Sequence, residues 1–74
     1  MKLPPYEQNE IGMLQSRLPV TNGFFSIIAP HKYCGNRYEV AYIGDDHDLE
    51  PERFDTIEEV HAYVQQHPAY TETI

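Results

Sequence analysis

Cysteine is nearly absent from this 74-residue chain, which contains only Cys34. A single thiol cannot form a disulfide within the chain, and no Cys/His quartet at zinc-finger spacing takes its place. The length predicts one domain, residues 1–74, and a chain this short buries only about 60% of the surface that it exposes when unfolded. Its core is therefore expected to be marginal, with oligomerisation or a partner protein as the remaining common support.

Basic residues are also scarce: five Lys and Arg stand against twelve Asp and Glu, a net charge of −7. Affinity for nucleic acid comes largely from Lys and Arg that displace counterions from phosphates, so direct nucleic-acid binding is not expected. The acidity indicates either a well-solvated surface or a surface that steers a basic protein partner.

Long apolar runs are missing as well. No window approaches the ~20 apolar residues of a membrane span, so no membrane partner is expected. Residues 1–6 lack the apolar stretch that a secretory signal needs. A lone thiol without an export signal predicts a cytoplasmic location.

The N-terminal part carries apolar residues at helical spacing. Two prolines predict extended chain over residues 1–5. Ile11, Leu14 and Leu18 recur at intervals of three and four, which predicts a helix over residues 6–18 that a proline ends.

Two strands and a hairpin are predicted in the middle of the chain. Residues 24–29 are rich in aromatic and β-branched side chains, and residues 37–43 alternate between two faces. The connection 31–36 contains a Gly-Asn pair that tolerates positive φ. After the polar loop 44–51, residues 52–54 could add a third short strand.

Residues 56–67 are predicted to form a C-terminal helix. Thr56 begins a capping box, in which its hydroxyl accepts from the Glu59 amide and the Glu59 carboxylate reaches back. A proline follows the helix, and residues 69–74 are expected to be a frayed tail. An apolar stripe at helical spacing points inward: Ile57, Val60 and Val64.

Together these elements predict an α+β fold: an N-terminal helix, a two- or three-stranded antiparallel sheet, and a C-terminal helix packed on one face. In the first strand, Phe25 and Ile27 face one way while Phe24 and Ile28 face the other, so both faces need cover. If the C-terminal helix covers one, the N-terminal helix or a second copy must cover the other. A homodimer is therefore one expectation, and the sheet edges could also pair with a partner.

The acidic loop invites a calcium interpretation. An EF-hand loop that starts at Asp46 requires glycine at its sixth position and glutamate at its twelfth, where this chain has Pro51 and Ile57. The pattern favours a solvated turn over a looser hard-cation site at Asp46, Asp48 and Glu50.

The spacing His31-x-x-Cys34 supplies half of a tetrahedral zinc site, which His47, His61 or a second subunit would have to complete. The alternative is a hairpin tip with a solvated histidine and a small, partly buried cysteine. No spacing pairs a nucleophile with a base and an orienting acid. The sequence thus predicts no catalytic residue, no metal, no cofactor and no enzymatic activity.

Six tyrosines are the remaining unusual feature. Tyrosine gives a large contact area at low entropy cost and is enriched at interface centres, although Tyr38 and Tyr42 could instead be core residues with their hydroxyls at the rim. The predicted partner-binding surface combines three tyrosines with the acidic loop: Tyr33, Tyr38, Tyr42, Asp45, Asp46, Asp48, Glu50 and Glu52.

The run Arg37-Tyr38-Glu39-Val40, followed by Arg53-Phe54-Asp55-Thr56-Ile57-Glu58-Glu59-Val60, resembles the small domains at the N-terminus of phage-type integrases. The resemblance covers under half of the chain and implies a three-stranded sheet with a capped helix. Those domains read DNA with basic residues on the sheet. Here the corresponding strand and loop are acidic, so DNA binding is not carried over.

The sequence therefore predicts a non-catalytic protein-interaction module that binds a host protein, of the inhibitor or adaptor kind that phages and mobile elements carry. One alternative is a nucleic-acid mimic whose carboxylates occupy a basic groove on a partner, with binding that weakens in salt. Another is a metal-binding sensor or small enzyme, which predicts bound metal and a melting point that falls with chelator.

Overall fold

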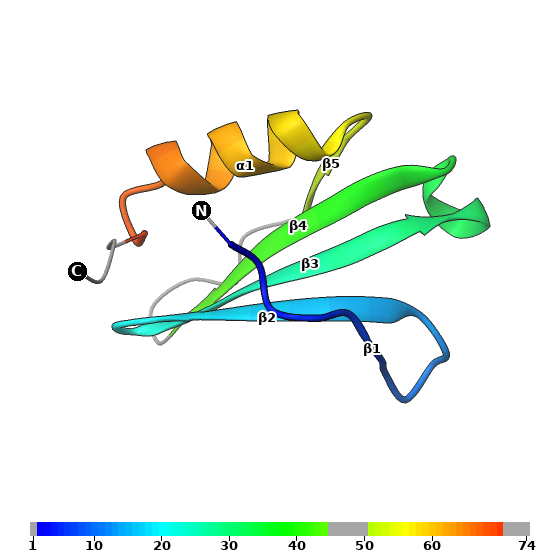
Figure 1. Ribbon diagram of the computed structural model, residues 1–74, viewed down its shortest axis with the longest axis horizontal. Coiled ribbons are helices and arrows are strands. Elements are labelled where there is room, and N and C mark those ends of the chain that lie inside the picture. The colour runs from blue at the N-terminus through cyan, green and yellow to red at the C-terminus, as the bar shows by residue number, and fades with distance from the viewer. Residues whose placement is uncertain (1, 45–50, 71–74) are drawn as a thin grey trace.

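The chain folds as a five-stranded antiparallel sheet with one α-helix in the computed structural model, which describes residues 2–44 and 51–70 (Figure 1). Strands that are neighbours in sequence are neighbours in the sheet, so the topology is a meander. The elements in chain order are β1 (Glu7–Gln8), β2 (Leu14–Val20), β3 (Gly23–His31), the 3₁₀ turn η1 (Lys32–Cys34), β4 (Arg37–Gly44), β5 (Glu52–Phe54) and α1 (Ile57–Gln66).

The N-terminal helix expected over residues 6–18 is wrong, because that stretch contains β1, a turn and the first part of β2. Gly12 adopts a φ of +85°, which no helix accommodates, and the Asn9 carboxamide oxygen accepts from the amides of Ile11 and Met13 at 3.1 and 2.9 Å. The fold is therefore mostly β, with a single C-terminal α-helix among the described residues.

The proline expected to end that helix instead lies inside β2, where Pro19 pairs with Phe24 of β3. On its outer side β2 pairs with β1 only at Leu14 and Gln15, so Pro19 lies where β2 is an edge strand. An edge tolerates proline because no neighbouring strand requires its missing N–H.

The two central strands were predicted correctly in kind and are longer than expected. β3 continues through Pro30 to His31, with a register irregularity between Ile28 and His31. The Gly35-Asn36 pair turns the chain with φ values of +65° and +60°, as expected for this hairpin. The third short strand is confirmed as β5, which pairs with β4.

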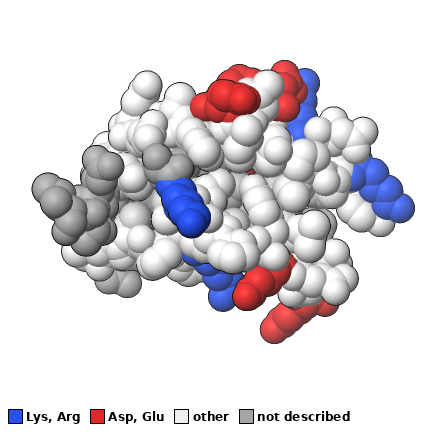
Figure 2. All heavy atoms as spheres, viewed as in Figure 1, with Lys and Arg blue, Asp and Glu red and all other residues white. Residues whose placement is uncertain are grey.

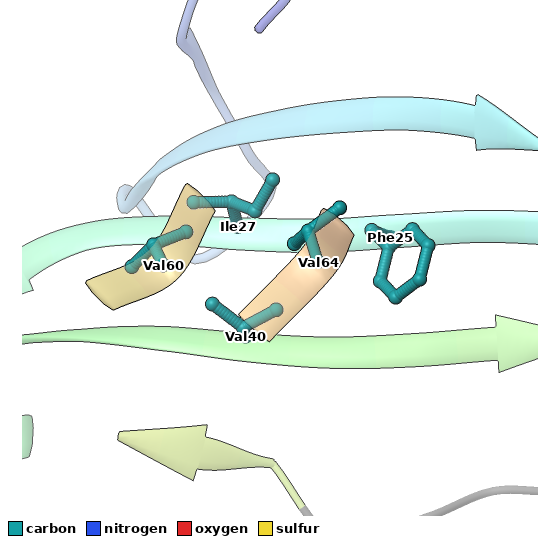
Figure 3. Close-up of a cluster of buried hydrophobic side chains, with 5 residues drawn as sticks. All are labelled: Phe25, Ile27, Val40, Val60 and Val64. Carbon is teal, nitrogen blue, oxygen red and sulfur yellow. The ribbon is translucent and has the colours of Figure 1, made fainter. Parts of the chain in front are cut away.

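The C-terminal helix and its cap are confirmed. The Thr56 Oγ1 accepts from the Glu59 amide at 3.2 Å, as expected. The Glu59 carboxylate was expected to accept from the Thr56 amide, but it accepts from the Thr56 hydroxyl at 3.1 Å instead. Val60 and Val64 are fully buried (Figure 3). The helix thus contributes an apolar stripe to the core.

The core lies between α1 and one face of the sheet, where Val60 and Val64 meet Phe25, Ile27 and Val40 (Figure 3). The chain segments before β1 and after α1 also pack against the core on this face. They contribute Leu3, Tyr6, Ala69 and Tyr70. The tail expected to fray from residue 69 therefore begins with two packed residues, and residues 71–74 lie outside the described part. None of the helices described here is long and apolar enough to cross a membrane.

Candidate functional site

The sheet has a second face, opposite α1, that no α-helix among the described residues covers; η1 lies over its hairpin end. Side chains alternate along each strand, so the neighbours of the core residues Phe25, Ile27 and Val40 point to this side. The strand register brings them into rows across the sheet. We call this surface the open face: Glu7, Gln15, Arg17, Pro19, Phe24, Ser26, Ile28, Glu39, Ala41, Ile43 and Arg53.

The centre of the open face is apolar and shallow. Phe24 pairs with Ile43, which is 40% exposed, and the Arg17 guanidinium lies 5.6 Å from the Phe24 ring centroid. Ser26 pairs with Ala41 in the next row, and the Ser26 hydroxyl accepts from Gln15 Nε2 at 2.6 Å. Ser26 is itself buried, so the apolar surface that another molecule can contact consists of Ile43 with the half-buried Phe24 and Ala41.

The charges on the open face balance, although the chain is strongly acidic. The face carries two carboxylates, Glu7 and Glu39, and two guanidinium groups, Arg17 and Arg53. Figure 2 shows acidic side chains in two groups, one at the upper edge and one at the lower edge. The acidic residues around the start of α1 are Glu52, Asp55, Glu58 and Glu59. The open face therefore has no net charge, although the chain as a whole has a net charge of −7.

A polar cluster lies where the open face meets the β3–β4 hairpin. Cys34 Sγ donates to Glu39 Oε2 at 2.6 Å, and Arg53 Nε donates to Cys34 Sγ at 3.1 Å. His31 Nε2 lies 3.8 Å from the same Glu39 oxygen. The hydrogen bond to Cys34 raises the pKa of the Arg53 guanidinium above its usual value, and the nearby Glu39 carboxylate acts in the same direction.

Local folding explains why these four side chains meet. The irregularity after Ile28 ends β3 at His31, and η1 then places Cys34, which is 6% exposed, back over the sheet. Glu39 and Arg53 are direct register partners on β4 and β5. Both ring nitrogens of His31 are buried and have no hydrogen-bond partner among the described residues.

Among the residues predicted to bind a partner, the three tyrosines do not lie on one surface. Tyr33 is 77% exposed in η1, with the Lys32 ammonium 5.2 Å from its ring, whereas Tyr38 and Tyr42 pack against the core on the α1 side. Glu52 is exposed on β5. The other four predicted residues, Asp45, Asp46, Asp48 and Glu50, lie outside the described residues.

Sequence reasoning found His31 and Cys34 but missed Glu39 and Arg53. The alternation of β4 does place Glu39 on the face away from Val40, which was a usable signal. The pairing of Glu39 with Arg53 depends on the β4–β5 register, which no local pattern specifies.

Two hollows in the described surface lie beside the hairpins. The larger, about 680 Å³, lies along the N-terminal segment and the β1–β2 hairpin, and its lining contains no His, Cys, Ser or Lys: Pro4, Pro5, Glu7, Gln8, Asn9, Glu10, Ile11, Gln15 and Arg17. The smaller, about 260 Å³, lies between the tips of the β1–β2 and β3–β4 hairpins, and its lining includes His31. Neither lining includes a serine or a cysteine. Comparison with known proteins finds no matching family model, no matching curated protein and no matching solved structure.

Proposed function

We propose that this chain is a non-catalytic protein-interaction module, and that its open face binds a second copy of the same chain. The observation that carries the proposal is the apolar centre formed by the exposed Ile43 and the half-buried Phe24, Ile28 and Ala41, on a sheet whose other face is already covered. A small domain with one buried sheet face gains most by burying the second against a partner.

Charge selects a second copy as the occupant. Two chains of net charge −7 repel each other in most relative orientations. The repulsion is weakest where the facing surfaces carry equal numbers of positive and negative charges. In a two-fold dimer the same patch meets itself, so the exposed Glu7 and Arg17 of each open face can lie opposite complementary groups. The acidic residues around the start of α1 then remain outside, where they could steer a basic partner to an adaptor of this kind.

Size predicts a dimer of modest affinity. The five strands contain 29 residues in all. At ~3.3 Å per residue and about 4.8 Å between strands, the face measures roughly 460 Å² before side-chain relief. Stable interfaces bury about 800 Å² of accessible surface per partner, so the open face is smaller than a standard interface. We therefore expect a dimer that dissociates on dilution.

The test is light scattering after size-exclusion chromatography over a series of protein concentrations. Ile43→Lys places a charge in the apolar centre, and Ile11→Lys is the matched control because it changes another exposed isoleucine, 73% exposed at the β1–β2 tip. We expect dimers in the wild type and in Ile11→Lys, and monomers in Ile43→Lys. Added salt should not weaken the dimer, because screening reduces the repulsion between acidic chains.

A wild-type chain that stays monomeric up to about 0.5 mM would reject the second-copy proposal, because a Kd above that value is too weak for a specific dimer of this size. Dimers that persist in Ile43→Lys would place the interface elsewhere. A complex that forms only with a basic protein and weakens in salt would favour the acidic surface, and with it the nucleic-acid mimic.

A further inference from the structure

We propose that His31, Cys34 and Glu39 form a binding site for a zinc ion. Their ligand atoms, one imidazole nitrogen, one sulfur and one carboxylate oxygen, all lie within 4.8 Å of one another. The three residues come from the end of β3, from η1 and from β4, so the hairpin and its register hold them together. Glu39 is the register partner of Ile28, so this site adjoins the hairpin end of the open face.

The histidine provides an independent observation. Both nitrogens of the His31 ring are buried and lack a hydrogen-bond partner among the described residues, which is a costly state for a polar group. The ring sits against Tyr33, with 6.1 Å between the centroids, and 3.8 Å from the carboxylate. A metal ion bound to Nε2 would satisfy one of these nitrogens and explain why the ring is held beside a sulfur and a carboxylate.

The chemistry of the three ligands selects the metal. Thiolate and imidazole suit zinc, whereas Ca²⁺ and Mg²⁺ take oxygen ligands almost alone. Zinc with one thiolate and one carboxylate has no net charge. Arg53 can still donate its hydrogen bond to the Cys34 sulfur. Residues that do not bind the metal themselves often orient a metal ligand through a hydrogen bond of this kind.

The geometry requires one small adjustment. Bond lengths of 2.0–2.3 Å at tetrahedral angles put ligand atoms about 3.3–3.6 Å apart. The 3.8 Å separation of His31 Nε2 and Glu39 Oε2 is close to that range, while the 2.6 Å separation of Cys34 Sγ and Glu39 Oε2 must lengthen by about 1 Å. Rotation of the Glu39 side chain is sufficient, since Glu39 is partly exposed.

Binding would replace the hydrogen bond between Cys34 and Glu39. The thiol proton that Glu39 accepts leaves to water, and the thiolate and carboxylate each form a bond to the ion. The described residues supply three ligands and no fourth, so a water molecule completes the tetrahedron.

The test is titration of the untagged, metal-free protein with zinc, and with Co²⁺ as a spectroscopic probe. We expect one ion per chain, a higher melting temperature with zinc, and a sulfur-to-cobalt charge-transfer band. Cys34→Ala should abolish the band, and Glu39→Gln and His31→Asn should each weaken zinc binding at least about tenfold. The matched control is His61→Gln, a partly buried histidine on α1 outside the cluster, which should leave binding unchanged.

Circular dichroism of the metal-free variants checks that they fold. If Cys34→Ala unfolds, the cobalt spectrum of the wild type and the Glu39→Gln titration still decide. No zinc binding up to about 100 μM, which corresponds to about −5.5 kcal/mol, would overturn the proposal, as would binding that all three substitutions leave intact. Because Ile43→Lys should bind zinc normally, failure of this site and failure of the dimer are distinguishable.

Discussion

At the scale of single residues, the tyrosines divide by environment. Tyr6 packs against the core, and its hydroxyl is buried without a hydrogen-bond partner among the described residues. Burial raises the pKa of Tyr6, and the neighbouring Tyr38 raises it further. Burial also raises the pKa of Tyr63, with a smaller contribution from Glu52. Tyr33, by contrast, is 77% exposed.

These shifts predict a loss of stability in alkali. A phenol whose pKa is higher in the folded state keeps its proton longer there, so the unfolded state binds fewer protons once the pH passes about 10. The free energy of unfolding should therefore be constant below that pH and fall as the pH rises through the folded pKa of Tyr6. Tyr6→Phe should make this decline shallower, as measured by urea unfolding between pH 8 and 11.

Tyr33→Phe is the matched control and should leave the alkaline decline unchanged, because its hydroxyl is solvated in both states. At neutral pH Tyr6→Phe should not destabilise the fold, since it removes a buried hydroxyl that has no partner among the described residues. A wild-type stability that does not change up to pH 11 would contradict the prediction.

At the scale of secondary-structure elements, β3 separates two roles on adjacent residues. Ile27 is fully buried beneath α1, whereas Ile28 lies on the open face. Ile27→Ala should cost about 2–5 kcal/mol of unfolding free energy, which is most of the stability of a domain this small. Ile28→Ala should cost well under half of that, as measured by chemical denaturation of both variants at low concentration.

The same pair links stability to association. Ile28→Ala should weaken the dimer more than it weakens the fold, because its side chain contributes to the surface that the second copy buries. If instead both variants lost equal stability at concentrations where the protein is monomeric, the open face would already be covered within the chain.

The elements also show how far the sequence determined this fold. The β3–β4 hairpin, β5 and α1 were predictable because alternation, turn residues and a cap each act within a few residues. β2 was not, because Leu14 and Leu18 are four residues apart, an interval that fits both a helix and a strand. Leu18 packs against the core from β2, and β2 is a strand because it pairs with β3.

The candidate sites follow the same division. The alternation of one strand alone was enough to assign Phe24 and Ile28 to a second face of the sheet. Both residues do lie on the face opposite the core. The cluster of His31, Cys34, Glu39 and Arg53 needed a bulge, a 3₁₀ turn and the register of β4 with β5. Non-local pairing of that kind leaves no periodic trace in the sequence.

At the scale of the whole molecule, one helix and two terminal segments cover a single face of a five-stranded sheet (Figure 1). The principal extents of 34 × 25 × 23 Å leave room for little more than one layer of core. With no disulfide possible within the chain, its stability must come mainly from that layer.

A chain stabilised by its own dimer should melt at a temperature that depends on concentration. Because dimerisation favours only the folded state, a tenfold increase in protein adds about 0.7 kcal/mol per chain once dimers dominate, or roughly 3–5 °C in a domain of this size. Calorimetry at several concentrations should therefore show Tm rising in the wild type and in Ile11→Lys but constant in Ile43→Lys. A Tm independent of concentration in all three would mean that the sheet is stable with its second face in water. A rise in Ile43→Lys equal to that of the wild type would place the stabilising contact away from β4.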